Sequence, residues 1–250
     1  MIHSFLLIGQ SNAAGRGFLN EAGPLDTCDG KLLVARNGLW LKIFRPVNPD
    51  RKFSGTCFAE TFAKAYSNAH PEVQVGIIPC ADGGTTIAQW QPGEILFDNA
   101  VNCARLAMRT SHLAGILWHQ GEGDCRADQY PFYAQQLQKV INGLRTALGR
   151  QDLPVLVGGL GDFLKERKDA DHLENYLHIN AALQKVAEED TYCCYVPAHG
   201  LTSNPDFLHF NAASLAEFGY RYFEAYNSLP IYSTPAITTD HTERTALEQL

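Results

Sequence analysis

The residues whose types could perform chemistry fall into a few short segments scattered along the chain. Ser11 lies in GQSNAAGRG, the neighbouring Gly83 and Gly84 lie in CADGGTTIAQW, and Gln120 lies in HQGEGD. Much later, Asp206 and His209 occur three residues apart in PDFLHF. A hydroxyl, amide donors, and an acid beside an imidazole are the groups that acyl transfer requires. These segments predict acyl-transfer chemistry, provided that the fold brings them together.

The glycine-flanked serine segment has a second interpretation, a loop that cradles a phosphate. A dinucleotide fingerprint needs G-x-G-x-x-G and a phosphate loop needs G-K-[ST], and GQSNAAGRG contains neither. The G-x-S-x-G elbow of α/β-hydrolases matches only at Gly9, because Ala13 replaces the second glycine. An α/β-hydrolase would also place its serine near the middle of the chain. We therefore disfavour both a nucleotide site and the α/β-hydrolase elbow.

The elements that must position these residues are indicated by hydrophobic periodicity. Apolar runs rich in β-branched residues are typical of strands that are buried on both faces, and apolar residues at helical spacing lie between them. The expected strands are 4–9, 73–79, 114–118, 154–158 and 192–197, and the helical patterns are 57–69, 100–109, 130–149, 172–189 and 212–227. Alternation of strands and helices gives right-handed crossovers and a parallel sheet. The sequence thus predicts an α/β fold, a three-layer α/β/α sandwich around a parallel sheet of about five strands.

In such a sheet, ligands bind at the carboxyl ends of the strands. Each chemically interesting segment follows a predicted strand, so we expect these segments along one edge of the sheet. The irregular segment 18–55, with a short edge strand at 31–35 or 39–44, is expected to shape the binding site.

The sequence resembles the SGNH hydrolases, specifically the carbohydrate acetylesterase branch that includes acetylxylan esterases and sialate O-acetylesterases. The four blocks GQSNAAGRG, IIPCADGGTTIAQW, GILWHQGEGD and PDFLHF occur in family order and span nearly the whole chain. The resemblance implies an SGNH or flavodoxin-like fold. It also implies a serine esterase that removes O-acetyl groups from carbohydrates through an acetyl-serine intermediate.

The resemblance also assigns roles to single residues. It implies that Ser11 is the nucleophile, His209 the general base and Asp206 the residue that orients the imidazole. The amides of Ser11, Gly83 and Gln120 would form the oxyanion hole. No metal and no organic cofactor is implied.

Three positions depart from the pattern of the resembled branch. Ala13 stands where Met is usual, Gly123 where Ser or Ala is common, and Phe207-Leu208 where a glycine normally separates the acid from the base. The choice between Gly83 and Gly84 as the oxyanion donor is open, and the resemblance favours Gly83.

Other polar residues in the blocks keep two interpretations. Glu122 and Asp124 could form a carboxylate pair like that of a glycosidase, or a tight turn in which Glu122 accepts backbone N–H bonds. Arg16 and Asn12 could brace the serine segment or contact the substrate. His199 is a rival base, but no acid lies three residues before it.

Two other functions stay open at this stage. One is a thioesterase or general short-chain esterase of the same superfamily, which would need an apolar acyl groove. The other is a carbohydrate-binding relative without catalysis. Trp90 and Trp118 could flank a sugar, although Trp118 continues an apolar run and is expected in the core.

Composition limits the partners. The formal net charge is −7 and the sequence has no long basic run, which argues against nucleic acid and anionic membranes. A small carbohydrate ester is the expected substrate. The seven cysteines include no C-x-x-C pair, so neither a disulfide framework nor a metal site is expected.

The chain organisation is simple. Residues 1–229 are expected to form a single catalytic domain, and 230–250 a peripheral or disordered tail, because the periodicity ends there. The opening MIHSFLLIGQ has too short an apolar run for a signal peptide, which favours a cytoplasmic protein. The sequence does not indicate an oligomeric state.

Overall fold

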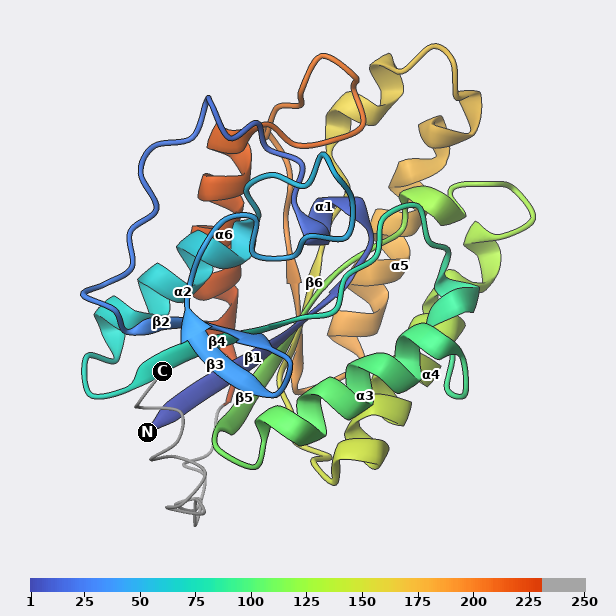
Figure 1. Cartoon of the computed structure of the whole chain (residues 1–250). Coiled ribbons are helices and arrows are strands. Elements are labelled where there is room, and N and C mark those ends of the chain that lie inside the picture. Colours follow the sequence, from blue (N-terminus) through green and yellow to red (C-terminus); the bar gives the residue numbers. More distant parts are fainter. Residues whose placement is uncertain (231–250) are drawn as a thin grey trace.

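A seven-stranded sheet with helices on both faces forms the body of the protein (Figure 1). The computed structural model describes residues 1–230, so the predicted tail lies, from 231 onward, outside the described residues. The strands are β1 Ile2–Gly9, β2 Leu32–Arg36, β3 Leu39–Lys42, β4 Gln74–Pro79, β5 His112–His119, β6 Val155–Gly158 and β7 Cys193–Val196. All five predicted strands are present, and the α/β class is confirmed.

Besides the five predicted strands, the sheet contains the two segments proposed as alternatives for a short edge strand. Its order is β3-β2-β4-β1-β5-β6-β7, and all neighbours are parallel except β2 and β3. Both candidate edge segments form strands, because Asn37 and Gly38 take positive φ values and join them in a tight hairpin. The other five strands keep the order β4-β1-β5-β6-β7, which is the flavodoxin-like arrangement.

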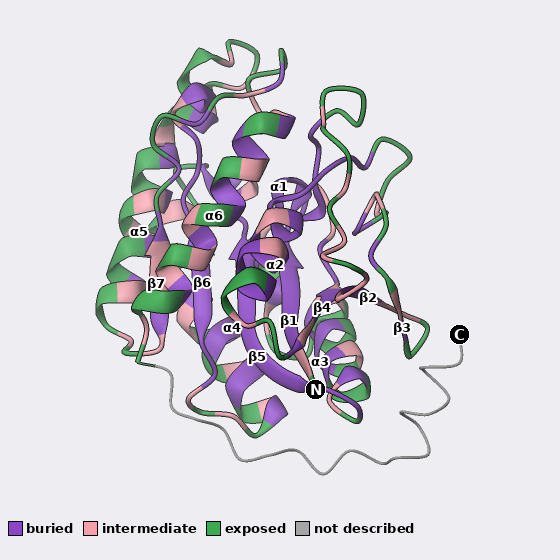
Figure 2. Ribbon diagram, turned by 90° about the vertical axis from the view of Figure 1, so that its left-hand side faces the viewer, coloured by how far each residue is buried: buried purple, intermediate pink, exposed green. Residues whose placement is uncertain are grey.

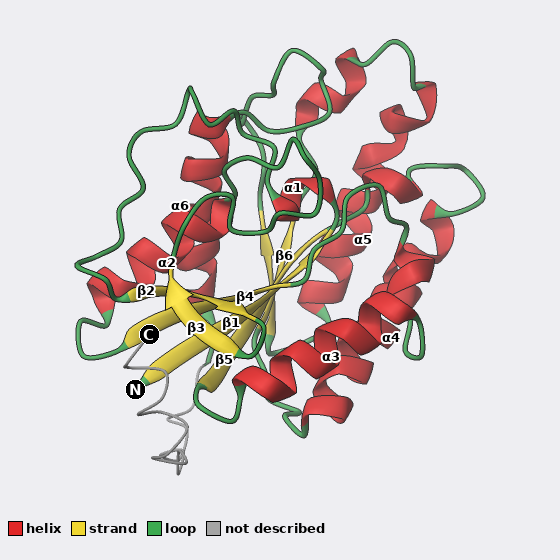
Figure 3. Cartoon of the chain, viewed as in Figure 1, coloured by secondary structure: helices red, strands yellow, loops and turns green. Residues whose placement is uncertain are grey.

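Helices cover the two faces of the sheet. Within the described residues they are α1 Ser11–Ala14, α2 Phe58–Ala69, α3 Ile95–Ala107, α4 Tyr133–Leu148, α5 Tyr176–Glu188 and α6 Ala212–Ser228. Figure 3 shows α2 and α6 on one face and α3, α4 and α5 on the other. The short α1, which the periodicity did not predict, lies at the carboxyl edge. Over residues 1–230, no helix combines the length and the hydropathy that a membrane crossing needs.

The central strands β1, β4, β5 and β6 are largely buried on both faces, as Figure 2 shows, whereas β3 at the edge is partly exposed. Every residue of β5 and β6 is buried, because helices cover both sides of the sheet. Between the sheet and the α2/α6 layer, aromatic rings fill the space, with Phe58 stacked on Tyr222 at 4.2 Å between ring centroids. This burial explains why continuous apolar runs, rather than alternating ones, mark the strands.

The chain leaves the sheet at the end of β1 and turns toward Ser11. Gly9 has φ +125°, and a Cβ on it would lie only 2.0 Å from the carbonyl oxygen of His119 on β5. Only glycine allows this close approach together with this backbone conformation. The chain can then turn at the β1/β5 boundary, where the strand order reverses, and present Ser11 there.

Candidate active site

Ser11, Asp206 and His209 meet at the carboxyl edge of the sheet. Ser11 begins α1 directly after β1, whereas Asp206 and His209 lie in the loop between β7 and α6. The Nε2 atom of His209 lies 3.0 Å from Ser11 Oγ, across 198 residues of sequence. On the other side of the ring, Nδ1 lies 2.6 Å from Asp206 Oδ2. The structure therefore places a hydroxyl, an imidazole and a carboxylate in one hydrogen-bonded series.

The loop from Asp206 to His209 folds back so that its acid meets its imidazole. Phe207 adopts φ +50°, a left-handed conformation that costs a non-glycine residue about 1–2 kcal/mol. The bend lets Asp206 Oδ1 accept the N–H groups of Leu208 and His209, each at 3.0 Å. The bulkier spacer thus leaves the carboxylate in contact with the imidazole.

The environment of Asp206 favours its ionised form. Partial burial raises the pKa of this carboxyl, but hydrogen bonds from the His209 ring and from two backbone N–H groups outweigh burial and lower the pKa to about 2. Asp206 is therefore an anion across the neutral pH range and can hold the Nδ1 proton of His209.

Asn12 connects the serine segment to the histidine loop. Its Nδ2 atom donates to Leu208 O at 3.2 Å and to Glu122 Oε1 at 2.6 Å, and its Oδ1 atom accepts the N–H of Phe210 at 3.1 Å. The two loop residues flank His209. Only 1% of Asn12 and 3% of Glu122 is exposed, so these bonds form away from water. Asn12 was expected either to brace the serine segment or to contact the substrate, and these bonds match the bracing role. Glu122 accepts a hydrogen bond from the side-chain amide of Asn12.

Gln120 and Asp124 hold the turn that follows β5. Gln120 Nε2 lies 3.1 Å from both Gln10 Oε1 and Thr85 O, and 2.5 Å from Asp124 Oδ2. The residue is completely buried. A primary amide has two N–H donors, and three acceptors already surround this one. The amide nitrogen of Gln120 thus faces acceptors from three loops, Gln10, Thr85 and Asp124. Its role as an oxyanion donor stays a prediction.

Gly83 lies beside the serine, but its amide has another partner. A Cβ built on Gly83 would lie 3.4 Å from Ser11 Cβ, whereas one built on Gly84 would meet nothing within 4 Å. Gly83 is therefore the nearer of the two candidate glycines. Its N–H donates to Asp50 Oδ2 at 2.8 Å. An oxyanion could receive this N–H only in exchange for Asp50.

Asp50 is a site residue that the sequence left unassigned. Its buried carboxylate accepts both ends of the Arg16 guanidinium, at 2.9 and 2.7 Å, and the Ser54 hydroxyl at 2.8 Å. Burial raises the pKa of Asp50, but the bonds from Arg16 and Ser54 lower it overall. The only sequence signal is Arg16 in the first block, since a buried guanidinium requires an acidic partner. Which acid that is depends on the fold.

A cavity of about 410 Å³ opens next to His209. Its lining comes from Arg16–Asn20, Lys52–Gly55, Asn204, Asp206 and His209. The volume is within the range of small-molecule sites. Figure 1 shows the irregular segments after α1 and before α2 passing over this edge of the sheet, close to the loop before α6. The segment 18–55 thus contributes to the surface around the site.

Comparison with known proteins gives matches over almost all of the described chain. Residues 1–228 match the family model described as "Carbohydrate esterase, sialic acid-specific acetylesterase". An Arabidopsis thaliana protein named "Probable carbohydrate esterase At4g34215" is 25% identical over 253 residues, which cover 90% of each chain.

Solved structures share the fold. The X-ray structure of the same Arabidopsis protein has a TM-score of 0.76 at 24% identity, covering 90% of this chain and 98% of that one. The crystal structure of NanS has a TM-score of 0.71 at 18% identity, covering 90% and 96%. A carbohydrate acetylesterase from Xanthomonas citri, XAC1771, has a TM-score of 0.64 at 20% identity, covering 93% and 58%.

Proposed function

The chain belongs to the carbohydrate esterase family of sialic acid-specific acetylesterases, and we propose that it removes O-acetyl groups from carbohydrates through an acetyl ester formed on Ser11. Membership makes the protein a carboxylic ester hydrolase. The serine mechanism is supported by one observation above all, the hydrogen-bonded series Ser11 Oγ, His209 and Asp206, with distances of 3.0 and 2.6 Å.

In the first half-reaction, Ser11 Oγ attacks the carbonyl carbon of the acetyl group while His209 Nε2 accepts the hydroxyl proton. The bond between the carbonyl carbon and the sugar oxygen then breaks, and His209 returns the proton to that oxygen. The deacetylated sugar leaves and the acetyl group stays on Ser11. Asp206 stabilises the imidazolium during these transfers, because it is ionised and bonded to Nδ1.

In the second half-reaction, a water molecule takes the place of the sugar. His209 Nε2 accepts a proton from this water, whose oxygen attacks the acetyl carbon. The ester bond to Ser11 breaks, the proton passes to Ser11 Oγ, and acetate leaves. The starting hydrogen bonds are then restored.

The negative oxygen of each tetrahedral intermediate needs amide donors. One is the N–H of Ser11, at the first residue of α1, where helical N–H groups have no acceptor within the helix. The other is the adjacent Gly83 N–H, which would exchange Asp50 for the oxyanion. In this proposal Gln120 supports the site by fixing the turn after β5.

A serine-directed fluorophosphonate tests the nucleophile. We expect one adduct, found by peptide mapping on Ser11, together with loss of acetate release. Ser11→Ala should give neither labelling nor activity, while Ser228→Ala at the end of α6 should behave as wild type. An adduct on another residue, or an active preparation that takes no label, would contradict the proposal.

A general short-chain esterase is the alternative that one observation favours, because Phe18, Leu19 and Phe53 are large apolar residues on the cavity wall. Such a wall could hold an acyl chain instead of a sugar. Comparison of 4-nitrophenyl acetate with the butyrate separates the two: the acetylesterase prefers the acetate, and an acyl groove favours the longer chain.

A further inference from the structure

The cavity beside His209 is the space available to the alcohol half of a bound ester. This step depends on the proposed function, because His209 has to protonate the leaving sugar oxygen, which must therefore lie close to its Nε2 atom. The sugar ring then extends from that oxygen along the cavity. Asp206 and His209 form part of its wall.

Another part of the wall is apolar and exposed. Phe53 is 69% exposed, Leu19 47% and Phe18 44%. Large apolar side chains gathered at one place on the surface mark a binding site. The two candidate tryptophans do not take part, since Trp90 and Trp118 are each only 1% exposed and pack on one another in the core.

Phe53 is held in place by the buried charges beneath it. Its ring packs against the Arg16 guanidinium, at 5.1 Å from the guanidinium carbon to the ring centroid. Arg16 is fixed by its two bonds to Asp50, and the neighbouring Ser54 bonds the same carboxylate. The aromatic ring is thus attached to the serine segment.

The same loop is also tied to the glycine turn. Arg51 donates to Asp82 Oδ1 at 2.7 Å and to Gly83 O at 3.0 Å. The loop that carries Phe53 is therefore anchored both to the serine segment and to the glycine turn. A surface that is already ordered loses little conformational freedom when a ligand binds, which favours a built binding site over an incidentally exposed ring.

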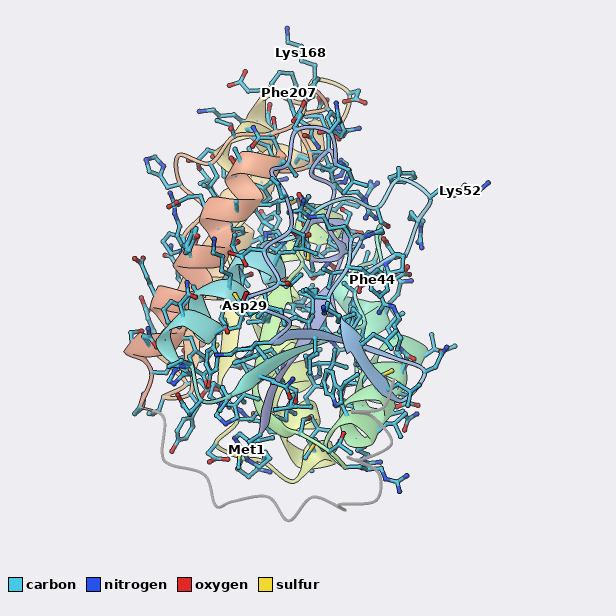
Figure 4. All side chains as sticks on the ribbon, turned by 60° about the vertical axis from the view of Figure 1, so that its left-hand side comes forward. Met1, Asp29, Phe44, Lys52, Lys168 and Phe207 are labelled. Carbon is cyan, nitrogen blue, oxygen red and sulfur yellow. The ribbon has the colours of Figure 1, made fainter. Side chains whose placement is uncertain are left out.

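Two of the charged side chains that line the cavity, Arg16 and Asp206, have partners within the protein. Arg16 is paired with Asp50, and Asp206 at the rim is negative. Lys52 lines the cavity with part of its chain, but Figure 4 shows it extending away from the body of the protein. A carboxylate on the sugar would lose hydration there and gain no dedicated cation.

From these observations we propose that the cavity is the subsite of a neutral acetylated pyranoside, whose C–H face packs on Phe53 while its acetyl ester reaches Ser11. The wall selects the uncharged sugar over a sugar acid, although the family is described by its sialic acid-specific members. Phe53 is the residue that determines the preference for a sugar ring.

The first experiment compares Phe53→Ala with Phe44→Ala. Phe44 is a matched control, because it lies in the same irregular segment, is 41% exposed and packs on Arg36, yet it is outside the cavity (Figure 4). Acetate release is measured with methyl β-D-xylopyranoside acetylated at every hydroxyl, and with ethyl acetate, which has no ring. Phe53→Ala should lower kcat/KM for the pyranoside about tenfold and leave ethyl acetate unchanged. Phe44→Ala should change neither.

Equal values for wild type and Phe53→Ala on the pyranoside, or equal losses on both esters, would overturn the subsite. So would a loss confined to esters with long acyl chains, which would identify an acyl groove. Ser11→Ala in the same assay separates the two proposals: if it keeps activity, the serine mechanism fails, whatever Phe53 does.

The second experiment tests the charge. The fully O-acetylated methyl glycoside of N-acetylneuraminic acid is compared with its carboxyl methyl ester, so that the two substrates differ in the negative charge and one methyl group. We expect the ester to release acetate with a several-fold higher kcat/KM, and Lys52→Ala to keep that ratio. A higher value for the free acid would refute the selection of neutral sugars.

Discussion

Two pairs of aspartate and histidine lie at the carboxyl edge of the sheet, and only one of them has a serine. In the first pair, Asp206 Oδ2 and His209 Nδ1 are 2.6 Å apart, and in the second, Asp162 Oδ2 and His199 Nδ1 are 2.8 Å apart. The distances are nearly equal. The exposure of the two histidines differs greatly, since 92% of the His199 side chain is exposed but only 17% of the His209 side chain.

The comparison teaches that contact between an acid and an imidazole does not by itself make a general base. The loop of His209 is clamped by Asn12 on both sides of the histidine, and its Nε2 atom faces the Ser11 hydroxyl. In the described part of the chain, no serine hydroxyl bonds to the His199 ring. Water screens the charges of an exposed pair of this kind, so the pair contributes little to the stability of the fold. Three pairs of variants test this distinction, and a pH measurement extends the comparison to a third histidine.

The largest expected difference is between His209→Gln and His199→Gln. Loss of the base at Ser11 should lower kcat for acetate release by at least about 10⁴-fold, because serine, histidine and acid act as a unit. His199→Gln should stay within about twofold, as an exposed surface substitution does. A large loss in the His199 variant would show that the exposed pair also takes part.

Substitution of the two aspartates should affect kcat in the same order as substitution of their histidines, but to a smaller extent. Asp206→Asn should lower kcat about 10³- to 10⁴-fold, because the amide no longer fixes the Nδ1 proton and no longer stabilises the imidazolium. Asp162→Asn should leave kcat unchanged. Thermal unfolding of both variants checks that the fold is retained, and equal kinetics for the two would contradict the assignment of Asp206.

A smaller effect is expected from loosening the clamp on the histidine loop. Asn12→Asp places a carboxylate against that of Glu122 and should lower kcat about 10- to 100-fold, because small displacements of a reacting group are costly. The double variant Asn12→Asp with Glu122→Gln restores a donor and an acceptor between the two positions, with the same net charge as wild type. It should recover part of the rate, while KM stays close to wild type. If both variants are equally slow, the bond between Asn12 and Glu122 does not position His209.

The smallest effect concerns a histidine at the opposite edge of the sheet. His112 begins β5, where burial first and then the charge of Arg150 lower its pKa to about 4 from an ordinary value of 6.5. Between these values the unfolded chain binds a proton that the folded protein does not. The free energy of unfolding should therefore fall as the pH drops from 6.5 toward 4.

His112→Gln tests this contribution by urea unfolding at pH 7 and pH 5. The variant should lose less stability over that interval than wild type, by on the order of 1 kcal/mol. The same pH dependence in both proteins would mean that His112 has an unaltered proton affinity in the folded state.

Much of the fold could be read from local patterns, and the exceptions have physical causes. The five buried strands were predictable because helices cover both faces, which requires continuous apolar runs such as those of β5 and β6. The hairpin of β2 and β3 was ambiguous, since each segment is short and one lies at the edge of the sheet. The four residues of α1 are too few for a helical period to be seen.

The sequence by itself determined the α/β class, the edge of the sheet at which the chemical segments gather, and the residue types that acyl transfer needs. The tertiary structure alone decided the partner of each group: Asp50 for Gly83 and Arg16, the turn for Gln120, and Asn12 for the two sides of His209. The reason is that hydrophobic periods and turn residues are local along the chain. A hydrogen bond between distant residues depends on placement within a fraction of an ångström, which no local pattern encodes.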